Sequence, residues 1–363
     1  MSRSEFDFIE RVRRQVAKRH DATRRHTSLV HGIGDDAAVV RGRGAACDTV
    51  VTADLLVEDV DFRRAYAPPR LLGHKALAVS LSDVAAMGAR PRFALLSAGL
   101  PRDVWESDGL DDFYAGYLAL AEHFGVTLVG GDVSRTPERI VFDSVVLGEV
   151  ARGRAVMRAG ARPGDRIFVT GALGGASAGL RLLEAGARLK TQSTRGARTR
   201  TTHATAATRR AVSPAAARER RLLRHLRPDP RVEWGRRLGE ARLASAMIDL
   251  SDGLSSDLAH LCRESGVGAA VEASLLPLDP HVRRAGTDAD PLALALDGGE
   301  DFELLFTVPP RRAARLPAEL GGVTVTEIGE ITDDKHGLRL RQDGRTRPLR
   351  PTGFTHFGNN DER

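Results

Sequence analysis

Acidic residues recur in this sequence directly after glycines or where a predicted strand ends, and such positions present charged side chains to a ligand. Glycines let a backbone approach a ligand closely and leave its N–H groups unhindered. One Gly-Gly-Asp or Asp-Gly pair is usually only a turn, but several such loops in one chain indicate a shared ligand. The residues are Asp35 and Asp36 after Gly32-Ile33-Gly34, Asp54, Asp132 after Gly130-Gly131, Asp249 and Asp252 around Leu250-Ser251, and Glu300 and Asp301 after Gly298-Gly299.

Asp83 lies among the apolar residues of Leu77–Met87, a stretch that predicts a buried helix. A buried carboxylate costs free energy unless it is paired or bound to a metal. Magnesium takes one or two carboxylates from a protein and completes its coordination with water and phosphate oxygens. Joining two phosphorylated molecules requires that several negative charges be neutralised at close quarters, so more than one magnesium is needed. The carboxylates therefore predict a phosphotransfer site that binds several Mg2+ ions.

Other phosphate-binding motifs are missing from the chain. The nearest approach to G-x-x-x-x-G-K-[ST] is Gly174–Gly179, which is followed by Leu180-Arg181. The turn Gly171–Gly175 departs from the G-x-G-x-x-G dinucleotide pattern. The His-Arg-Asp and Asp-Phe-Gly sequences of protein kinases do not occur either. If the chain is a kinase, it has another architecture.

The elements that must position these carboxylates alternate between strands and helices, which predicts an α/β (α+β) protein. At 363 residues the chain exceeds what one core usually organises. We expect two mixed α/β domains, residues 1–150 and 151–363, with a cleft between them. Strands are expected at Thr49–Asp54, Phe93–Leu100, Val126–Val129, Ile140–Val150, Asp165–Thr170, Ala244–Ile248, Gly268–Glu272 and Phe302–Val308, and helices at Pro69–Met87, Val104–Phe124, Ala176–Ala185 and Leu254–Ser265.

Composition points to a cytoplasmic globular protein. The apolar fraction of 42% is ordinary for a protein with a sizeable core. The charged start, Met1–Glu10, is unlike a signal peptide, and no apolar run reaches the roughly 20 residues that span a bilayer. Cys47 and Cys262 have no Cys or His neighbours at ligand spacing, so neither a disulfide framework nor a zinc site is expected. We expect no membrane partner.

The positive charge is concentrated in one segment. Residues 188–227 carry twelve Lys or Arg and one Glu, a net charge of +11, whereas the whole chain is +6. The remainder is therefore acidic, at −5. Within this segment, residues 191–217 lack an apolar period and predict a flexible insertion. Such charge runs are usually solvated loops, and this one has no aromatic residues for base stacking, so we expect no nucleic-acid partner.

The motifs together resemble the thiamine-monophosphate kinase family, in the superfamily of aminoimidazole-ribonucleotide synthetase and selenophosphate synthetase. The resemblance spans Phe6 to about Phe357 without the insertion, and the last two motifs favour the thiamine enzymes. The matching segments are Gly32–Val39, Thr52–Glu58, Lys75–Ala89, Gly130–Asp132, Arg158–Asp165, Ile248–Leu254 and Gly298–Leu304.

The resemblance implies transfer of the γ-phosphoryl group of ATP onto thiamine monophosphate, giving thiamine diphosphate. It also implies a homodimer whose amino-terminal sheets join in a shared barrel, and a carboxy-terminal α/β sandwich. Asp36, Asp54, Asp83, Asp132 and Asp249 would form the catalytic centre. Magnesium would bind Asp36, Thr52, Asp54, Asp83, Asp132, Asp249 and Asp252; ATP would contact Tyr114, Gly131, Asp132, Arg158 and Ser251; the thiamine part would face Asp61, Glu300 and Phe354.

Two positions depart from the family pattern. Ala53 stands where the family usually has Thr or Ser, so one hydroxyl ligand is lost, although Thr52 remains beside it. Asp61 stands where a histidine is common. An acid at this position could pair with the cationic thiazolium ring.

Two other functions remain open from the sequence. Another enzyme of the same superfamily, such as an aminoimidazole-ribonucleotide synthetase, would keep the magnesium loops and change the acceptor pocket. A basic nucleic-acid-binding protein would draw only on residues 188–227. The substrate that stimulates ADP release distinguishes the two enzymes. Nucleic-acid binding that survives moderate salt would support the nucleic-acid-binding function.

Overall fold

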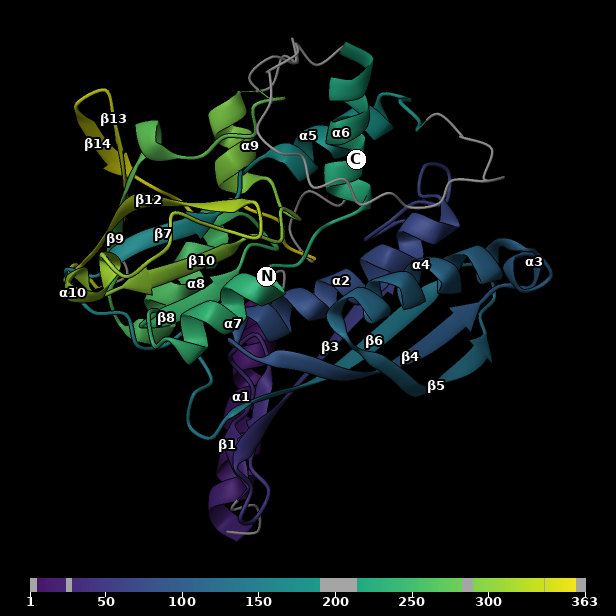
Figure 1. Cartoon of the computed structure of the whole chain (residues 1–363), viewed down its shortest axis with the longest axis horizontal. Helices are drawn as coiled ribbons and strands as arrows, with labels where there is room; N and C mark the ends of the chain where they lie inside the picture. Colours follow the sequence, from purple (N-terminus) through teal and green to yellow (C-terminus); the bar gives the residue numbers. More distant parts are fainter. Residues whose placement is uncertain (1–4, 24–27, 190–213, 283–289, 336, 357–363) are drawn as a thin grey trace.

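Two sheets form the framework of the molecule, and the helix α2 (Pro69–Ala86) contacts strands of both (Figure 1). The computed structural model describes residues 5–23, 28–189, 214–282, 290–335 and 337–356. The helices are α1 (Glu5–Thr23), α2, α3 (Arg102–Trp105), α4 (Gly109–Phe124), α5 (Gly175–Glu184), α6 (Pro214–Leu226), α7 (Val232–Glu240), α8 (Leu254–Ser265), α9 (Pro291–Asp297) and α10 (Pro310–Ala313), with a 3-10 turn at Ala273–Leu275.

The first sheet has six strands, all antiparallel to their neighbours except β4 and β5. Helices α2 and α4 cover one of its faces. The two helices approach each other closely at Gly73. A Cβ at this position would lie 1.9 Å from the carbonyl oxygen of Phe113, so the contact requires glycine. The strand order is β1 (Leu29–His31), β2 (Ala38–Val40), β3 (Cys47–Val57), β6 (Val141–Ala151), β4 (Arg90–Leu100) and β5 (Thr127–Arg135).

The second sheet has eight strands and is also mixed, since β9 and β13 run parallel. Apolar residues of α8 pack on one face, and those of α7 pack on the other. The strand order is β14 (Arg345–Pro348), β13 (Leu338–Gln342), β9 (Gly268–Glu272), β12 (Val323–Thr332), β7 (Arg166–Thr170), β10 (Leu304–Val308) and β8 (Ala246–Asp249), with β11 (Glu319–Leu320) paired to β12.

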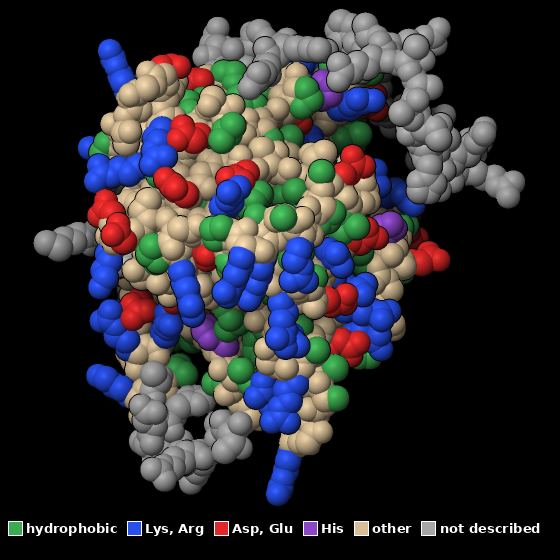
Figure 2. Space-filling model, turned by 60° about the vertical axis from the view of Figure 1, so that its left-hand side comes forward, with side chains coloured by type: hydrophobic (Ala, Val, Ile, Leu, Met, Phe, Trp, Pro, Cys, Tyr) green, Lys and Arg blue, Asp and Glu red, His purple; other side chains and the backbone are tan. Residues whose placement is uncertain are grey.

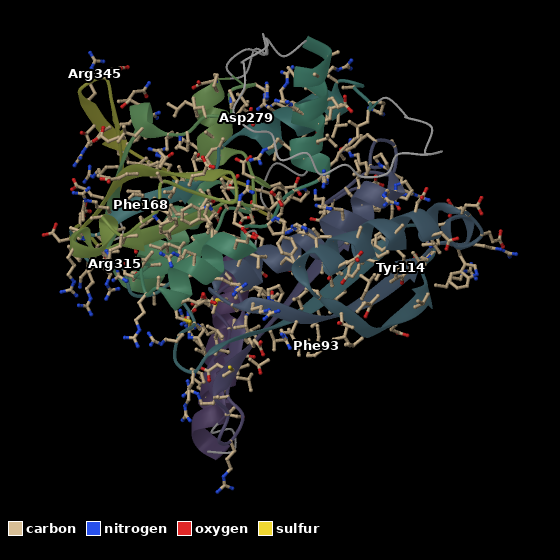
Figure 3. The ribbon with its side chains drawn as sticks, in the orientation of Figure 1. Phe93, Tyr114, Phe168, Asp279, Arg315 and Arg345 are labelled. Carbon is tan, nitrogen blue, oxygen red and sulfur yellow. The ribbon has the colours of Figure 1, made fainter. Side chains whose placement is uncertain are left out.

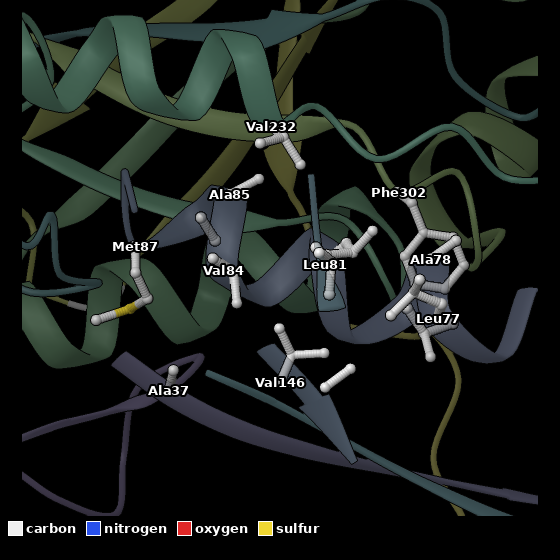
Figure 4. Close-up of a cluster of buried hydrophobic side chains, with 14 of the residues drawn as sticks. Ala37, Leu77, Ala78, Leu81, Val84, Ala85, Met87, Val146, Val232 and Phe302 are labelled. Atoms are coloured by element: carbon white, nitrogen blue, oxygen red, sulfur yellow. The ribbon is translucent and has the colours of Figure 1, made fainter. Parts of the chain in front are cut away.

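Helix α2 is buried along most of its length and carries apolar residues on all sides, as expected of a helix inside the core, with a few polar residues between them. Leu77 and Leu81 pack in the same cluster as Val146 of the first sheet and Val232 and Phe302 from the second half of the chain (Figure 4). The largest group of buried side chains therefore continues from one sheet to the other. The domain boundary near residue 150 stays a prediction; β6 ends at Ala151, and β7 begins at Arg166.

The sequence located the strands β3 to β10 and the helices α2, α4, α5 and α8, but it predicted none of β1, β2, β11 to β14, α1, α7, α9 and α10. Two of the predicted strands extend further than expected. β3 continues to Val57, so Asp54 lies inside a strand and not at its end. β5 runs from Thr127 to Arg135, through the Gly-Gly-Asp predicted as a loop. A Cβ at Gly131 would lie 1.8 Å from the Leu96 carbonyl oxygen. The glycine here permits close strand pairing and makes no turn.

The predicted helix Val104–Phe124 is two helices, α3 and α4. The Ser107 hydroxyl donates to the Val104 carbonyl at 2.8 Å and accepts from the Gly109 N–H at 3.3 Å. This side chain replaces backbone pairing that a continuous helix would have made.

Helix α6 begins at Pro214, inside the segment predicted as a flexible insertion. Residues 190–213 lie outside the described residues. Proline is common at a helix start because its missing N–H would be unpaired there anyway.

The face of the first sheet opposite α2 and α4 carries exposed apolar side chains. Leu55 of β3 is 57% exposed, Phe93 of β4 44% and Val129 of β5 55%. Figure 3 shows Phe93 on this side of the sheet. Exposed large apolar side chains gathered on one face of a sheet usually mark an interaction surface. The shared barrel itself stays a prediction, because one chain is described.

The surface over the second sheet carries many basic side chains with acidic ones between them (Figure 2). Arg166 pairs with Glu327 at 3.0 Å, and Arg341 pairs with Glu330 at 3.0 Å. This mixture differs from the single-sign stripe that follows a nucleic-acid backbone. None of the described helices combines the length and apolarity that crossing a bilayer requires.

Glu303 anchors a buried ion network beside β10. Arg231 donates to both of its carboxylate oxygens, at 2.5 and 2.6 Å, and Thr170 and Arg224 add hydrogen bonds at 2.7 and 3.2 Å. Burial alone would raise the pKa of Glu303, but the charge and hydrogen bonds of Arg231 lower it below its ordinary value. The network ties α6 and the start of α7 to the second sheet.

We expect Glu303→Gln to destabilise the fold by about 3 kcal/mol, because it removes the buried counter-charge of Arg231 and leaves only its contact with the exposed Asp229. Urea denaturation followed by circular dichroism measures the change. Glu327→Gln is the matched control, since it breaks a solvent-exposed ion pair whose loss costs less than about 1 kcal/mol. Equal urea midpoints for the two variants would contradict the role of Glu303.

Candidate active site

Three carboxylates from separate elements converge beside α2. Asp36 follows the loop of Gly34, Asp83 lies in the last turns of α2, and Asp249 ends β8. One carboxylate oxygen of each lies within 4.8 Å of the others. The sequence predicted all three as metal ligands. The structure brings them to one point.

Neighbouring hydroxyl groups orient the carboxylates. Ser82 of α2 donates to Asp249 Oδ2 at 2.7 Å, which links α2 to the second sheet. Thr52 of β3 donates to Asp83 Oδ2, which links α2 to the first. Both hydrogen bonds come from elements fixed by core packing. The spacing of the carboxylates is therefore set by the two sheets together.

Burial and mutual repulsion raise the pKa values of the carboxylates in the site. Burial, followed by the charge of Asp36, raises the pKa of Asp249 to about 8. Burial raises the pKa of Asp83 well above its ordinary value, and the charges of Asp54 and Asp249 raise it further. The pKa of Asp54 is raised to about 6, mainly by burial. Without a cation, this part of the site holds its carboxylates at an energetic cost.

Arg158 supplies positive charge next to the cluster. Its guanidinium donates to Asp36 Oδ1, with the Nε contact at 3.1 Å, and its backbone N–H donates to Asp35 Oδ2 at 3.0 Å. The pKa of Arg158 is raised: burial alone would lower it, but the charge of Asp36 outweighs burial. One arginine thus faces the buried pair Asp35 and Asp36.

Among the residues that the structure describes, two buried carboxylate oxygens lack a hydrogen-bond partner. They are Asp36 Oδ2 and Asp54 Oδ2. Buried acceptors are rarely left unpaired in proteins. Hard oxygen donors at this spacing suit Mg2+, which takes a few carboxylates and completes its shell with water and phosphate. The donor set therefore fits the predicted magnesium ions.

A cleft of about 1050 Å³ opens in front of the carboxylates. Residues predicted for metal, ATP and substrate share its lining, namely Asp36, Thr52, Arg158, Asp252 and Phe354. Helix α1 forms one wall, where Arg13 pairs with Glu264 of α8 at 3.2 Å. The sequence analysis did not predict α1, whose residues are mostly polar.

The loop that carries Glu300 is laid against the loop that carries Ser251. The Glu300 N–H donates to the Ser251 carbonyl at 2.8 Å. Glu300 and Phe302 both have left-handed φ values, 66° and 49°, which non-glycine residues adopt only under constraint. The Phe354 N–H donates to the Asp252 carbonyl at 3.0 Å. The predicted ATP, metal and substrate residues are thus joined through backbone hydrogen bonds.

Asp61 lies close enough to Glu300 for their charges to interact. Burial raises the pKa of Asp61, and the charge of Glu300 adds to this effect. Its carboxylate accepts the Val57 N–H at 2.7 Å, which closes the turn after β3. The three predicted substrate residues therefore lie near the same pair of loops.

Three of the predicted site residues lie away from this cleft, namely Tyr114, Gly131 and Asp132. They line a separate cavity of about 460 Å³ at the outer strand β5. Figure 3 marks Tyr114 at the helical layer over this part of the sheet. The register runs from Asp54 through Ser144 and Leu96 to Gly131, so three strand spacings of roughly 4.8 Å separate β3 from β5. One chain does not bring Asp132 to the other carboxylates.

The sequence analysis missed Lys75 and His225, which contact Glu300. Lys75 lies in the same apolar helix as Asp83, and the reasoning that singled out a buried carboxylate applies equally to a buried ammonium group. His225 carried no comparable signal, because α6 lies within the basic segment of residues 188–227 and contains many arginines.

Comparisons with known proteins agree with the motifs. AIR synthase related protein models match in two parts, the N-terminal domain over residues 34–150 and the C-terminal domain over 162–340. Thiamine-monophosphate kinase of Salmonella typhimurium is 37% identical over 335 residues, covering 90% of this chain and 91% of that protein.

Solved structures agree as well. Thiamine-monophosphate kinase from Stenotrophomonas maltophilia K279a is 37% identical with a TM-score of 0.71, covering 95% of this chain and 98% of the other. The structure of AaThiL complexed with AMPPCP and TMP is 31% identical with a TM-score of 0.77, covering 98% and 97%. The resemblance found in the motifs is confirmed, and the chain belongs to the thiamine-monophosphate kinase family of AIR synthase related proteins.

Proposed function

We propose that this protein transfers the γ-phosphoryl group of ATP onto the phosphate of thiamine monophosphate, giving thiamine diphosphate. The observation that carries the proposal is the convergence of Asp36, Asp83 and Asp249 beside a cleft that Asp36 lines together with Arg158 and Phe354. The names of its relatives, and the AMPPCP and TMP bound in AaThiL, support the same substrates.

Magnesium is the metal that the donor set fits. Asp36, Thr52, Asp54, Asp83, Asp249 and Asp252 would hold it, with Asp132 contributed as described below. The unpartnered oxygens of Asp36 and Asp54 and the raised pKa values of the buried carboxylates support this assignment. When bound, the ions neutralise charge on the reacting phosphates.

The main role of the protein side chains would be to position the two substrates. The nucleophile is already an ionised phosphate oxygen, so no side chain needs to remove a proton from it. Arg158 would exchange part of its contact with Asp36 for a phosphate of ATP, and Ser251 would donate to the same nucleotide. Asp61, Glu300 and Phe354 would hold the thiamine part, so that attacking and leaving oxygens lie in line.

A homodimer would complete the site. The open face of the first sheet is apolar at Leu55, Phe93 and Val129 and suits burial against a second copy. Asp132 pairs in register with Ser97, and directly opposite residues share a face of the sheet. Ser97 alternates with the buried Leu96 and Ala98, so Asp132 lies on this open face. A second copy packed on this face would therefore bring Asp132 of the outer strand β5 toward its partner's carboxylates.

We expect the purified protein, with ATP and Mg2+, to convert thiamine monophosphate to thiamine diphosphate and to leave unphosphorylated thiamine unchanged. Chromatographic separation of the thiamine products, coupled with ADP release, measures both reactions. Phosphorylation of free thiamine, or no turnover of the monophosphate, would refute the proposal. ADP release with formylglycinamidine ribonucleotide instead would support the aminoimidazole-ribonucleotide synthetase reading.

We expect Asp83→Asn to keep the fold and to lower phosphotransfer by at least about a hundredfold, since a neutral amide loses the charge that a metal requires. The pH dependence of stability gives a second readout. The folded-state pKa values of Asp54 and Asp249, about 6 and about 8, lie above the unfolded value of 3.8. The folded metal-free protein therefore binds more protons than the unfolded chain between about pH 4 and 8, and its stability falls as pH rises through this range.

Thermal unfolding with and without Mg2+ tests this reading of Asp83. Mg2+ should raise the Tm of the parent protein most at pH 8, whereas Asp83→Asn should raise the metal-free Tm and reduce the response to Mg2+. Asp103→Asn, an exposed acid at the start of α3, is the control and should match the parent. A normal Mg2+ response and normal activity in Asp83→Asn would make Asp83 structural.

We expect the parent protein to sediment as a dimer and Leu55→Glu to sediment as a monomer, because the new charge would be buried in the proposed interface. Leu118→Glu, on the solvent side of α4, introduces the same charge at a similarly exposed leucine and should leave the dimer intact. Sedimentation velocity over a concentration series measures both. A parent protein that stays monomeric would refute the shared sheet.

A further inference from the structure

Glu300 is held by two buried basic residues to which no role has been assigned so far. Lys75 is 3% exposed, and its Nζ lies 2.5 Å from Glu300 Oε1 and 3.3 Å from the Asp61 carbonyl. His225 is 4% exposed, and its Nδ1 lies 2.8 Å from Glu300 Oε2. The two basic groups come from α2 and α6, so helices distant in sequence hold one carboxylate.

The carboxylate of Glu300 is fixed on one side and open on the other. Each oxygen has one basic partner, while the side chain as a whole remains 28% exposed. A carboxylate has about four acceptor positions, so roughly two stay available. Its backbone is fixed as well, since the Glu300 N–H is bound to the Ser251 carbonyl and φ is 66°. Glu300 therefore presents a rigid acceptor whose side chain remains partly open to a ligand.

The two basic partners also decide how Glu300 acts on a ligand. Burial alone would raise the pKa of Glu300, but Lys75 and His225 hold it at about 2, so the group is ionised at neutral pH. The ammonium group of Lys75 compensates this negative charge at contact distance. A compensated carboxylate attracts a distant cation weakly but still accepts hydrogen bonds strongly. The arrangement favours recognition of an N–H group over recognition of positive charge.

We propose that Lys75 and His225 are positioning residues that make Glu300 a fixed, charge-compensated acceptor for the exocyclic amino group of the substrate's aminopyrimidine ring. The inference rests on the proposed function. Thiamine monophosphate has an amino group on its pyrimidine ring, whereas its thiazolium nitrogen carries no hydrogen. The amino group is thus the N–H donor that the organic part of the substrate offers to Glu300.

A substrate analogue isolates this contact. In the 4-deamino analogue of thiamine monophosphate a hydrogen replaces the amino group, while the thiazolium charge and the phosphate are unchanged. We expect the parent protein to prefer thiamine monophosphate over this analogue by about 10- to 100-fold in kcat/KM, the range for a hydrogen bond to a charged group. Because both substrates carry the same cation, the preference reports the amino contact alone.

Variants of the two basic residues should lower this preference through Glu300. Lys75→Met and His225→Gln should each reduce it several-fold, mainly through the KM for thiamine monophosphate, with the KM for ATP little changed. Lys75→Arg should restore most of the preference, since it keeps the charge. In a Glu300→Gln background, Lys75→Met should have little further effect on the preference, because the residue acts through Glu300.

Matched controls separate this effect from general damage. Lys335→Met and His123→Gln make the same changes at exposed positions and should keep the parent preference. Thermal unfolding checks that each variant is folded. Calorimetric binding of the two substrates to the parent protein, with AMPPCP present, gives the same comparison without turnover and without any variant.

The outcomes separate the inference from the proposed function. No turnover of thiamine monophosphate by the parent protein would refute both. Turnover with equal kcat/KM for the two substrates would leave the function standing and overturn the amino-group contact. A full preference in folded Lys75→Met and His225→Gln would show that these residues do not position Glu300.

Discussion

The carboxylate of Asp83 must be tolerated inside a helix that is buried on nearly every side, and much of the architecture follows from this constraint. Burial and the neighbouring charges of Asp54 and Asp249 both oppose its ionisation. The protein does not relieve this cost with a direct arginine partner for Asp83. It places hydroxyl groups of Thr52 and Ser82 around the carboxylates and leaves acceptor oxygens unpaired. Such a site gains stability when a cation enters.

The sequence predicted the parts of this site that local context determines. Asp83 stood out because its neighbours in the chain are apolar, and Asp249 because it ends a short strand. The same local reasoning placed Asp54 at a strand end and Asp132 in a loop, and both placements were wrong. β5 continues through Gly131 because β4 approaches too closely for a side chain, and such cross-strand contact leaves no mark in the neighbouring residues.

Other features depend on contacts that join distant segments. The contact of His225 with Glu300 depends on the packing of α6 against α5, and the sequence had assigned the start of α6 to a loop. Lys75 was visible in principle, since it interrupts the same apolar helix as Asp83. Asp132 would reach the other carboxylates only in the proposed dimer, because three strand spacings separate it from β3 within one chain.

Lys75 and Asp83 lie eight positions apart on one buried helix, which corresponds to about 12 Å along its axis. The helix fixes the distance between the acceptor at Glu300 and the carboxylates that would bind the phosphate-bound metal. Both ends are fixed to a rigid core, so the distance between ring and phosphate in an accepted molecule is prescribed. An analogue of the substrate with a longer or shorter link between ring and phosphate could make one of the two contacts but not both. The protein would then select substrates by length without a steric barrier.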